Sequence, residues 1–124
     1  MLLEIDDYKT LRDLQEKFNL CFPHLKIEFC KHRHHWQELS DPEEFFSPYL
    51  AAGLVRKIHD PGVLAIYSNQ KAGEVERRFS EDFGLHVQIF FNIDGRWVQT
   101  GTTDNMSLAD LHHRWKSGIS RLSL

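Results

Sequence analysis

The sequence has little cysteine and no long apolar run. Its two cysteines, Cys21 and Cys30, show no CxxC spacing, so neither a disulfide framework nor a cysteine-based zinc site is expected. We interpret both as reduced thiols of a cytoplasmic protein, where free cysteine usually behaves as a small buried hydrophobe. No stretch approaches 18 consecutive apolar residues, so no membrane-spanning helix is expected. Residues 1–9 lack the basic region and apolar run of a secretory signal.

An excess of basic residues is also missing. The formal net charge is −3, and the acidic excess lies within residues 1–61, because residues 62–124 balance seven basic against seven acidic side chains. A long-range field of this sign does not attract nucleic acid. Hydrophobic residues make up 41% and charged residues 27% of the 124-residue chain, which is typical of one globular domain. We therefore expect a single domain over residues 1–124.

The common catalytic motifs are absent from the sequence. It contains no GxSxG, P-loop, GxGxxG or HExxH pattern. The carboxylates are scattered over predicted helix faces or grouped at helix starts, where negative charge is stabilising. The sequence therefore predicts no catalytic residue, no cofactor-binding residue and no cofactor, and it favours a protein that is not an enzyme.

An internal repeat is the most informative pattern that is present. A shift of 61 residues superposes large apolar side chains of the two halves, and a slip of one residue extends the match through a predicted strand. This is the pattern of a duplicated supersecondary unit, with copies at about 1–61 and 62–124. The matched pairs include Leu3 with Leu64, Phe18 with Phe79, Trp36 with Trp97, and Leu25, Ile27 and Phe29 with Leu85, Val87 and Ile89.

Each copy reads as a β-α-β-β-α unit. The first strands are predicted near Leu2–Ile5 and Val63–Tyr67, and Pro23 and Gly84 end the helices that follow. Asp94-Gly95 predicts a tight hairpin. The predicted last helices begin at the Ser40–Glu43 capping pattern and near Thr103 to Ser107, the second running to about Trp115. The predicted buried stripes are Leu11, Leu14, Phe18 and Phe22 in the first copy and Ala72, Val75, Phe79 and Phe83 in the second.

These elements predict an α+β fold with one shared core. The turn at about Arg56–Gly62 is too short to separate two domains, so both copies are expected to contribute to one mixed sheet with helices mainly on one face. The alternative is a ferredoxin-like core from residues 1–67 with an appended α-β-β-α segment.

Several strings of the sequence resemble a known group of proteins. Thr10 to Gln15, Phe22 to Phe29, Val75 to Phe79, and Phe83 to Gln88, followed by Trp97 and Thr103-Asp104, are similar to a pattern in small bacterial α+β proteins. The resemblance covers about residues 9–111. That group has no established activity, so the resemblance implies a bacterial, cytoplasmic, single-domain protein and transfers no catalytic residue.

A histidine cluster is the candidate metal site. His32, His34 and His35 follow a predicted strand, and alternation would place His32 and His34 on one face. Imidazoles at this spacing suit Zn²⁺ or Ni²⁺, but a third or fourth ligand would have to come from elsewhere in the fold. The alternative is an exposed polar hairpin tip with no metal.

Lys31, Arg33 and Trp36 form a second candidate surface in the same segment. Basic and aromatic side chains together suit single-stranded nucleic acid. The acidic residues that follow argue against this reading, as does the match of Trp36 with Trp97, which favours a packing role.

The sequence is therefore compatible with three functions. The favoured one is a non-catalytic interaction or scaffold module that binds a protein partner or forms a homodimer, because the hairpins present sheet edges. A metal-binding protein or metal-dependent enzyme and a weak nucleic-acid binder are the alternatives.

Overall fold

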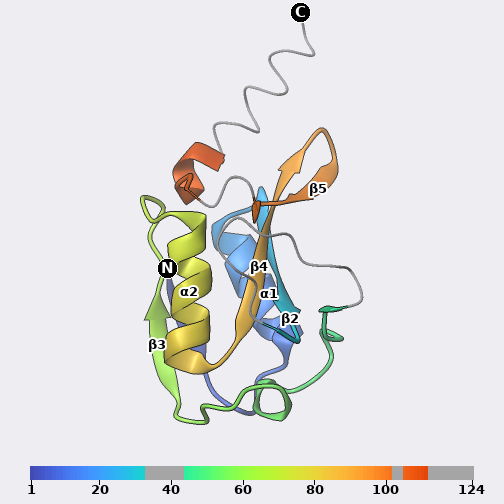
Figure 1. The fold of residues 1–124 in the computed structure, drawn as a ribbon, viewed down its shortest axis with the longest axis vertical. Helices are drawn as coiled ribbons and strands as arrows, with labels where there is room; N and C mark the ends of the chain where they lie inside the picture. Colours follow the sequence, from blue (N-terminus) through green and yellow to red (C-terminus); the bar gives the residue numbers. More distant parts are fainter. Residues whose placement is uncertain (33–43, 102–104, 112–124) are drawn as a thin grey trace, which may run out of the picture.

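The computed structural model describes residues 1–32, 44–101 and 105–111, and their fold is α+β, as predicted (Figure 1). Residues 108–111, the last that are described, are helical. None of the helices in this described part is long and apolar enough to traverse a bilayer. The named elements along the chain are β1 (Leu2–Ile5), α1 (Leu11–Cys21), β2 (Leu25–Cys30), a 3-10 helix η2 (Ala52–Leu54), β3 (Gly62–Ala65), α2 (Ala72–Phe83), β4 (His86–Ile93) and β5 (Arg96–Gln99).

The described strands form two antiparallel sheets rather than the one mixed sheet that was predicted. β1 pairs with β3, which places Leu3 opposite Leu64. The second sheet has the order β2-β4-β5, with Ile27 opposite Ile89. The mixed sheet is therefore wrong, and so is the ferredoxin-like alternative, because β1 and β2 belong to different sheets. Alternation in a strand fixes which face is buried and does not fix the pairing partner.

Local sequence explains where the two long helices begin and end. Thr10 and Asp13 form a capping box at the start of α1, each side chain accepting a hydrogen bond from the other's backbone N–H at 3.1 Å. Helix α1 ends at Cys21, shortly before Pro23. Helix α2 ends at Gly84, whose φ of 66° is the left-handed conformation that glycine adopts without strain. Both predicted helix ends are confirmed.

The two halves share one core, in agreement with the sequence. Helix α2 packs against β3 and β4, and α1 packs against β1 and β2 (Figure 1). Phe18 and Phe79 are both fully buried in the same cluster. The common interior is therefore confirmed, whereas the duplication stays a prediction. Trp97 is 39% exposed on β5, so the packing role inferred from its match with Trp36 is wrong for Trp97, and Trp36 lies outside the described residues.

The predicted last helices have different outcomes. Residues 40–43, with the predicted cap, lie outside the described residues; Glu44 is in a 3-10 conformation, and residues 45–50 are not helical. Instead, the N–H groups of Leu11 and Arg12 in the first turn of α1 donate to the carbonyls of Leu50 and Pro48. In the second half, a helical turn begins after Ser107, whose hydroxyl accepts from the N–H of Asp110 at 3.0 Å. This start is as predicted, and residues from 112 onward lie outside the description.

Candidate functional site: the edge strand β5 and its cation–aromatic face

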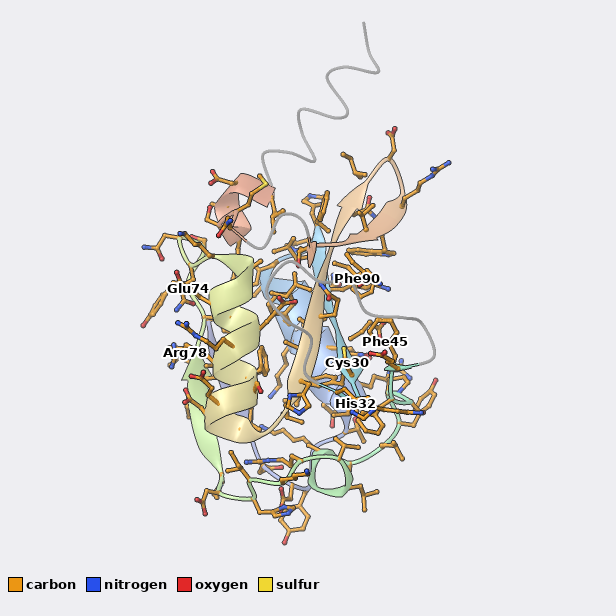
Figure 2. The ribbon with its side chains drawn as sticks, viewed as in Figure 1. Cys30, His32, Phe45, Glu74, Arg78 and Phe90 are labelled. Carbon is orange, nitrogen blue, oxygen red and sulfur yellow. The ribbon has the colours of Figure 1, made fainter. Side chains whose placement is uncertain are left out.

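The predicted histidine cluster is only partly described. His32 is exposed in a bend directly after β2 and is labelled in Figure 2, whereas His34, His35, Arg33 and Trp36 lie outside the described residues. Within the described ranges, no three metal-ligating side chains converge. The Zn²⁺ or Ni²⁺ site and the nucleic-acid surface of Lys31, Arg33 and Trp36 therefore stay predictions.

A cationic side chain caps one outward carbonyl on each outer edge of the β1–β3 sheet. The N–H of Ile66 donates to the carbonyl of Met1, and because hydrogen-bonded pairs alternate along an antiparallel ladder, the carbonyls of Glu4 and Ala65 point away from the partner strand. Lys9 Nζ donates to the Glu4 carbonyl and Arg78 Nη1 to the Ala65 carbonyl, both at 3.1 Å. These two carbonyls therefore already accept a hydrogen bond, which hinders pairing with an added strand at these positions.

The outer edge of β2 is covered as well. Asn19 Nδ2 donates to the carbonyl of Leu25 at 2.8 Å. The N–H of Phe46 donates to the carbonyl of Phe29 at 2.8 Å, and the N–H of Lys31 donates to the carbonyl of Glu44 at 2.7 Å. Side-chain and backbone groups from outside the sheet therefore close much of this edge.

Strand β5 forms the remaining edge, at the other side of the sheet from β2. The N–H of Thr100 donates to the carbonyl of Ile89 at 2.9 Å, and the alternation of the ladder then turns the N–H and carbonyl of Trp97 away from β4. No other residue in ranges 1–32, 44–101 and 105–111 caps these two groups of Trp97. The two-residue turn at Asp94 and Gly95, both with positive φ, fixes this register, as the sequence predicted. The edge of β5 at Trp97 is therefore open to another strand.

A cation–aromatic face flanks this open edge. Lys26 Nζ lies 4.9 Å from the centroid of the Phe90 ring and 5.2 Å from that of Trp97, which is favourable for an ammonium over aromatic rings. Phe45 packs on Phe90 with 5.8 Å between ring centroids. Glu28 accepts from Lys26 Nζ at 3.4 Å. Figure 2 shows Phe45 and Phe90 on the side of the sheet away from α2.

A buried polar network anchors the base of β5. Glu76, Gln88 and Thr100 are at most 6% exposed. Gln88 Nε2 donates to the Thr100 hydroxyl at 3.2 Å, and Glu76 Oε2 accepts from the N–H of Ile89 at 2.8 Å. These hydrogen bonds hold in place the point at which β5 separates from β4, because a buried polar group that loses its partner is costly.

A second polar cluster fixes the turn at about Arg56–Gly62. The Arg56 side chain is fully buried, and it donates to the carbonyls of Phe83 at 3.0 Å and Asp60 at 2.6 Å. Its guanidinium also lies 3.4 Å from Asp7, whose other carboxylate oxygen is 2.9 Å from His59 Nδ1. The cluster ties the chain before α1 to the end of α2, which is a structural role.

A cavity of about 320 Å³ lies between the end of α1 and the C-terminal helical turn. Its lining is mainly apolar, with Phe22, Leu25 and Leu108, and includes Cys21 and His24.

The two cysteines differ in burial. Cys21 is exposed and Cys30 is buried, so the prediction that both are small buried hydrophobes is confirmed for Cys30 and wrong for Cys21. Cys21 lies at the C-terminal end of α1.

Sequence reasoning did not identify the Lys26, Phe90 and Trp97 face, although one signal was present. Strand β4 carries two consecutive phenylalanines, Phe90 and Phe91, where strict alternation expects one. Phe91 is buried in the core, so Phe90 must lie on the opposite face.

Comparison with protein-family models, with curated proteins and with solved structures found no match to the chain. The bacterial resemblance accordingly stays a prediction.

Proposed function

We propose that this protein is a non-catalytic interaction module that binds an extended segment of a protein partner along the outer edge of β5. The observation that carries the proposal is the open N–H and carbonyl of Trp97, in contrast to the capped carbonyls of Glu4, Ala65 and Phe29. Natural sheets blunt the edges that must not pair, and recognition by strand addition uses an edge that has been left open.

The side chains of β5 support the same proposal. Trp97 and Val98 alternate across the strand and are 39% and 38% exposed, so each face of the strand offers apolar surface beside the open edge. Main-chain hydrogen bonds to an added strand would supply affinity, and these side chains would supply selectivity. Tryptophan is enriched among the residues that contribute most to binding.

Parallel selection from a random peptide library tests this function with two matched variants. Trp97→Ala removes the indole and retains the outward N–H, whereas Trp97→Pro removes both, and proline is tolerated where an edge N–H faces solvent. We expect peptides selected on the wild-type protein to bind Trp97→Ala more weakly and to lose binding to Trp97→Pro.

Changes in the amide chemical shifts of the wild-type protein on adding a selected peptide show where the peptide binds, even if a variant does not fold. Shifts centred on residues 96–99 support the proposal. Selected peptides that shift only other residues, or that bind both variants as well as the wild type, would refute it. A dimer in light scattering that dissociates in Trp97→Pro would identify the partner as a second copy of the chain.

A further inference from the structure

The positive charge of Lys26 near the Trp97 edge restricts the charge that a partner segment can carry. This inference rests on the proposed function. Lys26 is 30% exposed, and its ammonium is held 5.2 Å from the Trp97 ring. Cross-strand neighbours on one face of an antiparallel pair lie about 5 Å apart at Cβ. Lys26 belongs to β2, and β4 lies between β2 and β5, so a partner residue paired opposite Trp97 reaches this ammonium only with a side chain of about the length of glutamate that extends over the Trp97 ring.

We propose that the partner segment is acidic on the face that meets Trp97 and apolar on the face that meets Val98. An ammonium has three donors, and Glu28 accepts from Lys26 at 3.4 Å, so donors remain for a carboxylate of the partner. Arg96 is exposed two residues before Val98 and therefore lies on the Val98 face, where its charge disfavours a cationic partner without contributing to the Trp97 face. Val98 is 38% exposed and offers apolar contact on the other face. The partner sequence therefore alternates carboxylate and aliphatic residues with period two.

A second copy of this chain fits that chemistry poorly. Strand β5 consists of Arg96, Trp97, Val98 and Gln99, so a second β5 added antiparallel would bring no carboxylate to Lys26. It would bring another Arg96 instead. Opposite charges across a strand pair are favourable and like charges are not, so the edge favours a different, acidic segment.

Two synthetic nonapeptides test the charge preference directly. The acidic peptide alternates valine with glutamate between terminal threonines, and its control has lysine at each glutamate position. Binding is followed by the amide shifts of residues 96–99 at low salt. We expect the acidic peptide to bind the wild type about three- to fivefold more tightly, the size expected of a partly exposed ion pair.

Variants at Lys26 assign the preference to one side chain. Lys26→Met keeps the length of the stem and removes the charge, and we expect it to reduce the preference for the acidic peptide. Lys26→Glu should reverse the preference. Equal binding of the two peptides at β5, or a preference unchanged in Lys26→Met, would overturn this inference and leave the proposed function in place. Absence of any shift at residues 96–99 with either peptide at millimolar concentration would overturn both.

Discussion

Glu76 places a carboxylate inside the molecule, where it accepts the N–H of Ile89 at 2.8 Å. Removing one partner of a buried hydrogen bond leaves the other desolvated, at a cost of about 1–3 kcal/mol. We expect Glu76→Ala to lower the free energy of unfolding by this amount in urea titrations, and Glu76→Gln to lower it less because an acceptor oxygen remains. Glu74→Ala, at the half-buried first turn of α2, is the control, with an expected loss below about 1 kcal/mol. Equal losses at positions 74 and 76 would contradict this account.

The two cysteines differ in exposure and therefore in reactivity. Cys21 is exposed at the end of α1, and Cys30 is buried at the end of β2. We expect one equivalent of a thiol reagent to modify Cys21 in the native protein, with Cys30 reacting only after unfolding. Mass spectrometry of digests identifies the modified residue. Modification of Cys30 at the same rate as Cys21 would be incompatible with the described fold.

Asp6 gives the protein a pH-dependent contribution to stability. The backbone N–H of Lys9 donates to Asp6 Oδ1 at 2.9 Å and lowers the pKa of this carboxyl, with the N–H of Tyr8 acting in the same direction. A carboxyl with a depressed folded-state pKa stabilises the fold above its unfolded pKa of about 4, and the contribution disappears as pH falls through the folded value. Urea titrations from pH 7 to 3 should therefore show a smaller acid-induced loss of stability in Asp6→Asn than in the wild type. Identical pH profiles would contradict the assignment.

At the scale of elements, the caps on β1 and β3 make a prediction about self-association. Arg78 donates to the carbonyl of Ala65 from α2, and Lys9 donates to that of Glu4. Removing these donors exposes carbonyls on a short sheet whose outer face already carries Leu2 at 71% and Val63 at 54% exposure. We expect the double variant Arg78→Met and Lys9→Met to associate at concentrations where the wild-type protein does not.

Sedimentation velocity at matched concentrations measures this association. Arg12→Met is a suitable control, because Arg12 pairs with Glu16 on the exposed face of α1 and caps no strand. If Arg12→Met associates as strongly as the double variant, the loss of charge, rather than the uncapped strand edge, is responsible.

The elements that sequence reasoning located correctly have local causes. Helix α1 and β2 follow from hydrophobic periodicity, and the hairpin at Asp94 and Gly95 follows from turn chemistry. The predicted helix after the Ser40–Glu43 pattern is wrong for residues 45–50, where Pro48 disfavours a helix and its carbonyl accepts from the start of α1. Pro48 was visible in the sequence, whereas its partner across the fold was not.

Strand pairing and the candidate site could not be predicted from the sequence, because both depend on the order and register of the strands. The apolar alternation of β1 and β2 fits either one sheet or two. The caps by Lys9 and Arg78 depend on which carbonyls point outward, and only the ladder register determines this. Trp97 likewise has an ordinary strand pattern, and its open edge depends on β5 ending the order β2-β4-β5.

At the scale of the whole molecule, the two sheets and the two long helices bury one cluster of side chains drawn from both halves. This core explains the fold without a metal or a disulfide among the described residues. It also leaves β5 outside the main packing, since Phe91 and Val87 of β4 are buried whereas Trp97 and Val98 are not. The proposed binding function therefore depends on one edge strand, β5.

Amide hydrogen exchange at Trp97 tests that dependence most directly. In the free monomer, the outward N–H of Trp97 should exchange quickly, whereas that of Thr100, bonded to the carbonyl of Ile89, should be protected. Saturation with the acidic nonapeptide should slow exchange at Trp97 at least tenfold. An amide of Trp97 that is already protected in the free monomer, or that exchanges at the same rate in the saturated complex, would contradict the account.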